Sequence, residues 1–146
     1  MTKKIRIIGL FLILAVCLTS CGDSWIKPQI TSTIDEYSLT MSSVPGFPIK
    51  VGVTFDGPSA SITSIVLITN KGSFVEWGDD NKVINLGKEA KFSGKKIYWS
   101  PLEENDEIAD GAKITAIVSY IDKIIEVAKT TSIKIYKNKD GMYKIR

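Results

Sequence analysis

The stretch KITAIVSYIDKIIEVAKTTSIKIY, residues 113–136, decides the fold class of this chain. Apolar residues occupy every second position of its first half: Ile114, Ala116, Val118 and Tyr120. Successive side chains of a β-strand point to opposite faces, so this period of two indicates a strand with one buried face. Asp122 and Lys123 interrupt the run, and apolar residues resume from Ile124 to Tyr136. The stretch therefore predicts two long strands joined by a tight reversal.

The same period of two recurs in shorter segments on both sides of this stretch. Polar and glycine-rich breaks separate them, among them Asp56-Gly57-Pro58, Gly78–Asn81 and Asn138–Gly141, which are typical of turns. The segment 62–69 is apolar on both faces and is expected to be a central strand, whereas 102–109 is long enough for only one or two helical turns. Further strands are expected at 49–55, 74–77, 82–86, 96–99 and 142–145, with weaker candidates at 29–34 and 37–41.

Short antiparallel strands with polar turns predict an all-β chain folded as a β-sandwich of about seven to nine strands, because another sheet must cover each apolar face. The segment DGAKITA, residues 110–116, is similar to the segment that leads into strand F of immunoglobulin domains. Ile114 stands where that family has tyrosine, and Ala116 where it has cysteine. The resemblance implies an immunoglobulin-like or fibronectin type III-like sandwich, and it implies no function.

The amino-terminal segment has the composition of an export signal. Lys3, Lys4 and Arg6 precede an apolar run from Ile7 to Cys17. This run has 11 residues, whereas a membrane-spanning helix needs about 20. A cleaved signal peptide is therefore expected in place of a permanent span.

The residues Leu18-Thr19-Ser20-Cys21 that follow the apolar run resemble the lipobox of bacterial lipoproteins. The resemblance implies that the Cys21 thiol receives a diacylglycerol, that cleavage occurs before Cys21, and that the new amino terminus is acylated, so that palmitate labels the protein. Cys17 would leave with the signal, and the two cysteines would then not form a disulfide. The expected organisation is a signal peptide at 1–20, a lipidated tether at 21–27 and one sandwich domain at 28–146.

Removal of the signal leaves a chain without net charge. Three of the 19 Lys and Arg residues and none of the 16 acids lie in residues 1–20, so the formal charge of +3 belongs to the signal. A neutral exported domain is not expected to bind nucleic acid. It is expected on the outer face of the cell membrane, or on the outer membrane of a Gram-negative cell, because Gly22 replaces the aspartate that resembles an inner-membrane retention signal.

The residue inventory excludes most catalytic chemistry. The chain has no histidine, and lipidation leaves no free thiol, which excludes Cys/His zinc sites and histidine-assisted nucleophiles. It has no phosphate-binding glycine motif. The acidic segment 101–111 lacks the alternate spacing of calcium loops. We therefore expect no enzyme, no cofactor and no metal site, although a Ser-Lys dyad or a carboxylate pair remains open.

Two sets of side chains are candidates for ligand or partner contacts. Phe74 and Trp77 flank a turn and would offer an aromatic platform to a sugar or peptide, unless they pack in the core, as is expected of Trp99. An acidic cluster is a candidate docking surface for a basic partner, and a basic carboxyl-terminal hairpin is a second charged surface. For both, the alternative is an ordinary solvated surface. The acidic cluster comprises Glu103, Glu104, Asp106, Glu107 and Asp110, of which the first four are the candidate contacts, and the basic hairpin carries Lys134, Lys137, Lys139, Lys144 and Arg146.

These observations favour a lipid-anchored lipoprotein that serves as a binding or structural accessory module of the cell envelope. Its partners would be the membrane, through the lipid on Cys21, and a protein or glycan. The alternative is an inhibitor or immunity lipoprotein that neutralises a hydrolase or toxin at the cell surface. A carbohydrate-binding or enzymatic role is a distant third hypothesis.

Overall fold

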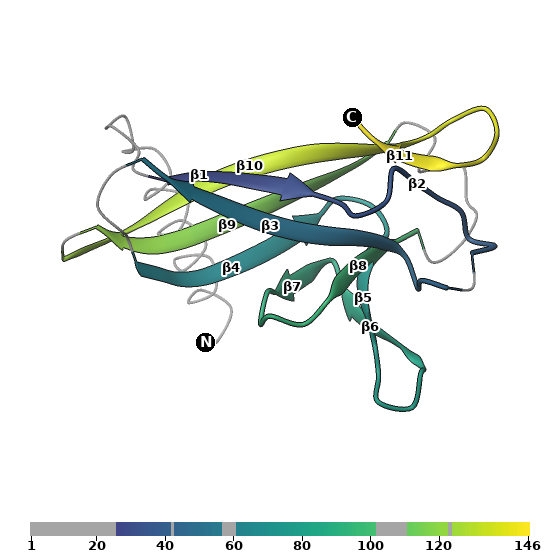
Figure 1. Ribbon diagram of the computed structural model, residues 1–146, viewed down its shortest axis with the longest axis horizontal. Coiled ribbons are helices and arrows are strands. Elements are labelled where there is room, and N and C mark those ends of the chain that lie inside the picture. The colour runs from purple at the N-terminus through teal and green to yellow at the C-terminus, as the bar shows by residue number, and fades with distance from the viewer. Residues whose placement is uncertain (1–25, 42, 57–60, 102–110, 123) are drawn as a thin grey trace, which may run out of the picture.

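The computed structural model describes residues 26–41, 43–56, 61–101, 111–122 and 124–146. These residues form eleven β-strands and contain no helix (Figure 1). The strands are β1 (Ile26–Thr31), β2 (Glu36–Tyr37), β3 (Phe47–Phe55), β4 (Ser61–Thr69), β5 (Ser73–Trp77), β6 (Val83–Gly87), β7 (Glu89–Lys91), β8 (Ile97–Ser100), β9 (Ala112–Asp122), β10 (Ile125–Lys137) and β11 (Tyr143–Ile145).

The strands form two antiparallel sheets. One has the order β1-β3-β8-β5-β6 and the other the order β2-β11-β10-β9-β4-β7. The long hairpin of β9 and β10 is paired without a register shift from Ile125 opposite Asp122 to Ile135 opposite Ala112. The structure thus confirms the hairpin predicted from residues 113–136, and with it the all-β antiparallel sandwich.

The main core lies between the inner faces of the two sheets. Trp99, Phe47 and Phe74 from the first sheet are fully buried with Ile114 and Ala116 from the second. The alternating burial of β9 follows its sequence, since every second side chain from Ala112 to Tyr120 is buried.

A second, smaller core cluster lies where β1 begins. Ile26, Val118 and Tyr120 are buried there, with Val53 and Val127 packed against them. Ile26 also pairs with Phe55 at the end of β3. The start of β1, the end of β3 and the β9–β10 turn therefore lie at the same end of the sandwich, the left end in Figure 1.

Two details differ from the sequence prediction, and a third is not tested. The strand count is eleven, above the predicted seven to nine, because strands β1 and β2 overlap the two weaker candidates at 29–34 and 37–41 and the chain also forms the short strand β7. The two-faced apolar strand β4 pairs with β9 along its length but with β7 only from Val66 to Ile68, so only that part is central. The predicted helical turns at 102–109 lie outside the described residues.

The turns follow the expected chemistry where the structure describes them. Asn138 begins the β10–β11 turn, and its side-chain oxygen accepts hydrogen bonds from the backbone N–H groups of Asp140 and Met142. Gly141 has a φ of 80°, a conformation that glycine adopts without a side-chain penalty.

Candidate binding site

A pocket of about 490 Å³ lies beside the first half of β3, within the size range of small-molecule sites. Its wall comes from four parts of the chain: the β1–β2 connection, the β2–β3 connection, the first half of β3, and the β7–β8 connection with β8. The lining residues are Thr33, Ile34, Val44, Pro48, Ile49, Lys50, Val51, Phe92, Gly94, Lys95, Lys96, Ile97 and Tyr98.

The pocket arises because two strands of one sheet separate. β3 and β8 pair only over three residues, from Phe47 opposite Trp99 to Ile49 opposite Ile97. The chain enters β8 from β7, which belongs to the other sheet. Within the described residues, β3 therefore continues past Ile49 with β1 as its hydrogen-bonded neighbour and no partner on the opposite side.

The interior of the pocket is apolar. Ile49 and Ile97 are buried members of the main core, and Ile34, Val44, Val51 and Phe92 pack against that core while remaining partly exposed. Partly exposed apolar side chains in a concave site offer a ligand apolar surface to cover.

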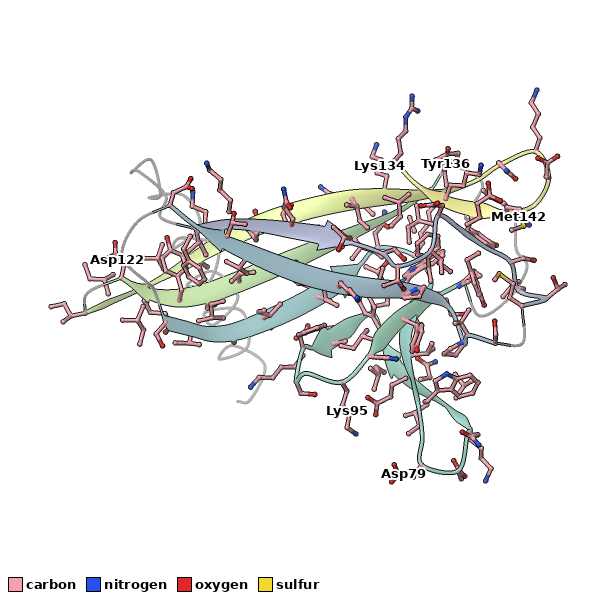
Figure 2. All side chains as sticks on the ribbon, in the orientation of Figure 1. Asp79, Lys95, Asp122, Lys134, Tyr136 and Met142 are labelled. Atoms are coloured by element: carbon pink, nitrogen blue, oxygen red, sulfur yellow. The ribbon has the colours of Figure 1, made fainter. Side chains whose placement is uncertain are left out.

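Three lysines supply the charge of the pocket lining. Lys50, Lys95 and Lys96 are exposed. The Lys95 Nζ lies 3.9 Å from the Glu76 Oε1, and Figure 2 shows Lys95 on the β7–β8 connection below β3. An apolar interior with basic side chains around it suits a molecule, or a peptide segment, that combines an apolar body with a negatively charged group.

The two aromatic residues predicted as a ligand platform lie in different environments. Phe74 is fully buried in the main core, so its side chain does not reach the surface. Trp77 is 39% exposed near the end of the β5–β6 hairpin, which projects from the sandwich in Figure 1, and it faces Val83 across the ladder. The structure therefore leaves Trp77 and Val83 as a small apolar surface and assigns Phe74 to the core.

The remaining predicted contact residues and the lipidation residue lie outside the described residues: Cys21, Glu103, Glu104, Asp106 and Glu107. Trp99 is fully buried, as predicted, and its Nε1 donates a hydrogen bond to the Lys71 carbonyl oxygen at 2.9 Å.

Part of the positive charge on the carboxyl-terminal hairpin is already engaged. Lys144 forms an ion pair with Glu36, and the hydrogen bond to this carboxylate raises the pKa of Lys144. The Lys137 ammonium lies 5.7 Å from the centre of the Tyr143 ring. Lys134, Lys139 and Arg146 are exposed. The hairpin is thus a weaker candidate than the pocket, because several of its charges serve the β2–β11–β10 edge.

The other resolved pKa shifts have local structural causes. Burial raises the pKa of Tyr37, whose hydroxyl lies in the core beside Ser100, and burial also raises the pKa of Tyr120. The Lys82 ammonium and backbone N–H hold the pKa of the Asp80 carboxyl below its usual range in the β5–β6 turn. None of these groups belongs to the pocket lining.

Searches for metal clusters and membrane spans gave no candidates in the described part of the chain. No group of three or more potential metal-ligating acids or cysteines comes together there. That part also holds no helix with the length and hydropathy of a membrane span.

Comparisons with protein-family models, with curated proteins and with solved structures found no match to this chain. The immunoglobulin-like relationship therefore stays a prediction, and the pocket is assigned on geometry alone. Sequence reasoning missed the pocket. The signal that was present is the pair Lys95-Lys96 directly before the buried strand β8.

Proposed function

We propose that this protein is a lipid-anchored lipoprotein of the extracytoplasmic face, and that its β-sandwich serves the cell envelope as a binding or structural accessory module. The observation that carries the proposal is Leu18-Thr19-Ser20-Cys21 at the end of an 11-residue apolar run that follows three basic residues. A run of that length is suited to an export signal and is short for a permanent span.

The pocket supports the binding role. It is concave, its interior is apolar, and exposed lysines line it, which is the combination expected of a site that recognises an amphipathic, negatively charged ligand or peptide segment. Strands β3 and β8 form one part of its wall, and the connections β1–β2, β2–β3 and β7–β8 form the rest.

The anchor is tested by replacing each cysteine in turn. Cys21→Ser removes the thiol that would accept lipid, so the variant is expected to incorporate no radiolabelled palmitate and to accumulate as a slower-migrating precursor. Cys17→Ser is the matched control, because its sulfur would leave with the signal, and it is expected to label and migrate like the wild type. Equal palmitate labelling of the Cys21→Ser variant would contradict the anchor.

The binding role is tested by site-specific photocrosslinking in intact cells. A photoreactive side chain at Lys96 lies at the pocket, whereas the same group at Lys139 lies on the β10–β11 turn. An adduct formed from position 96 and not from position 139 is the expected result. Identical adduct patterns from the two positions would contradict recognition by the pocket, and capture of a foreign hydrolase or toxin would favour the inhibitor or immunity role instead.

A further inference from the structure

Four isoleucines form an exposed apolar surface at the β9–β10 end of the sandwich. Ile124 in the β9–β10 turn is 94% exposed, Ile125 at the start of β10 is 66% exposed, and Ile121 at the end of β9 is 40% exposed. Ile62 on the neighbouring strand β4 is 38% exposed and pairs with Tyr120, beside Ile121. We call Ile62, Ile121, Ile124 and Ile125 the apolar tip.

Ile121 pairs with Glu126 and therefore lies on the outer face of the hairpin, whereas the exposure of Ile125 on the inward face follows from the unequal lengths of the two sheets. Val127 packs on the small core cluster that contains Ile26, the first residue of β1. Ile125 has the same side-chain direction as Val127 but lies two residues nearer the turn, beyond the end of the facing strand β1. The β9–β10 hairpin therefore extends past the described strands of the opposite sheet, as Figure 1 shows, and none of those strands covers its inward face there.

Such a surface is unusual for a hairpin end. Turns are normally formed by polar residues and glycine, because the reversal is exposed to water. Several exposed large apolar residues at one end of a domain typically mark a surface that contacts a partner or a membrane. Phe55, 41% exposed at the end of β3, adds apolar area at the same end.

The path of the chain distinguishes between a protein partner and a membrane as the surface that covers the tip. β1 begins with Ile26 at this end of the sandwich, and only four residues separate Ile26 from Cys21. Even fully extended, the five residue-to-residue steps from Cys21 to Ile26 span about 17 Å. In contrast, the 13 residues of β10 carry the hairpin to the other end of the molecule, about 40 Å away. A lipid on Cys21 thus keeps the end with the apolar tip close to the bilayer and the opposite end far from it.

We propose that the apolar tip inserts into the lipid–water interface of the bilayer that holds Cys21, and that it fixes the sandwich with this end down. The inference rests on the proposed lipid anchor and adds to it a second membrane contact, made by protein side chains. The ligand is the interfacial region of a bilayer, into which apolar side chains of surface-bound proteins penetrate by about 5–10 Å.

The charges at this end indicate that apolar contact drives the insertion. Lys27 is paired with Asp56, and the Glu126 carboxylate accepts a hydrogen bond from the Thr63 hydroxyl at 2.9 Å. Asp122 at the end of β9 adds a further acid. The described charged groups here are thus mainly acidic, and Lys123, which precedes Ile124 in the sequence, adds one basic residue; a zwitterionic bilayer is therefore expected to suffice.

Membrane retention alone does not test this contact, because two or more acyl chains already anchor a protein stably. The test uses the full lipidated protein with Ile124→Cys. The Cys21 sulfur carries lipid and Cys17 is cleaved off, so the introduced thiol is the single labelling position. The thiol is labelled with an environment-sensitive fluorophore, and the protein is reconstituted into phosphatidylcholine vesicles with or without a quencher on the acyl chains.

The matched control is Lys139→Cys, on the β10–β11 turn at the opposite end. The fluorophore at position 124 is expected to shift to shorter emission wavelengths and to be quenched by the lipid-borne quencher, whereas the fluorophore at 139 changes little. Ile125→Asp, at an exposed position and checked for an unchanged circular dichroism spectrum, is expected to reduce the quenching at 124.

The outcomes separate this inference from the anchor on which it rests. A palmitate-labelled protein whose position 124 is as exposed to water as position 139 overturns the insertion and leaves the anchor standing. Loss of palmitate labelling in the parent protein overturns both. A fluorophore at 124 that is shielded from water but insensitive to the lipid-borne quencher also overturns the insertion, because a second copy or another protein would then cover the tip.

Discussion

Replacement of Trp99 tests the packing of the main core. It also tests whether this tryptophan is a core residue or part of an exposed ligand platform. The Trp99 side chain is fully buried, its ring lies 5.7 Å from the ring of Tyr143 in an edge-to-face arrangement, and its Nε1 donates to the Lys71 carbonyl. The same carbonyl also accepts a hydrogen bond from the Thr69 hydroxyl at 2.6 Å. Trp99→Ala therefore removes a large apolar surface and one ring pair, but leaves the carbonyl with a partner.

The magnitude follows from these contacts. Burial of about 200 Å² at about 25 cal/mol per Å² corresponds to at most about 5 kcal/mol, of which the alanine methyl group keeps a small part. The ring pair adds about 0.5–1.5 kcal/mol, and the lost hydrogen bond about 1 kcal/mol. Relaxation of the sheets around the cavity offsets some of this, so the expected loss of unfolding free energy is about 3–5 kcal/mol.

The assay is urea unfolding of the chain Gly22–Arg146, followed by far-ultraviolet circular dichroism. Trp77→Ala is the matched control, because Trp77 is 39% exposed and its removal leaves no buried cavity. It is expected to cost less than about 1 kcal/mol. A loss below about 1 kcal/mol for Trp99→Ala would refute the core assignment, and losses of equal size for both variants would refute the contrast between the two tryptophans.

Three further predictions use the same chain. Gly72→Ala is expected to destabilise the domain by about 2–4 kcal/mol, because φ is 69° and the added Cβ would lie 2.6 Å from the Ser100 carbonyl oxygen. Gly94→Ala is the control, because its φ is 84° but the added Cβ would meet open space, and it is expected to cost only about 1 kcal/mol in the same urea assay. Burial raises the pKa of Tyr37, so the contribution of the neutral Tyr37 hydroxyl to stability is complete below about pH 10 and is lost as the pH rises through the folded-state pKa. The urea midpoint of the wild type is therefore expected to fall above pH 10, and Tyr37→Phe is expected to make this fall smaller. Calorimetric titration with CaCl₂ is expected to show no stoichiometric binding tighter than about 100 μM; such binding, if lost in Asp106→Asn, would contradict the prediction for segment 101–111.

The parts of the fold that follow from short-range patterns were predictable. The β9–β10 hairpin shows a period of two over its first strand, and a one-residue change of register would turn its buried side chains to water. The β10–β11 turn has the asparagine and glycine that its hydrogen bonds and its φ of 80° require. Here local preference and tertiary packing favour the same structure, so the sequence alone is informative.

Elements that depend on distant partners were not predictable. Strand β7 has the sequence EAK, which carries no strand signal, and it is paired because Val66–Ile68 of β4 present a free edge. The strand expected at 96–99 is confirmed as β8, but the burial of both its faces depends on elements that are distant in the sequence. The burial of Phe74 and the exposure of Trp77 likewise depend on where the β5–β6 hairpin leaves the sandwich, a property that the five residues of β5 do not encode.

The pocket and the apolar tip both result from the way the sheets end, and their spacing relates them to one another. Phe55 pairs with Ile26 at the end nearest Cys21, and Ile49 at the pocket lies six residues back along β3, about 20 Å away. The headgroup layer of one leaflet is about 5–7 Å thick, since a bilayer is about 40–45 Å across with a hydrocarbon core of about 30 Å. A sandwich whose tip sits in the interface therefore holds the pocket above the headgroups and open to water. If the lipid anchor and the insertion both hold, the short tether and the inserted tip would together restrict the height and the tilt of the domain. The ligand of the pocket would then be met at a fixed distance from the membrane surface, which suits recognition of another envelope component better than capture of a freely diffusing solute.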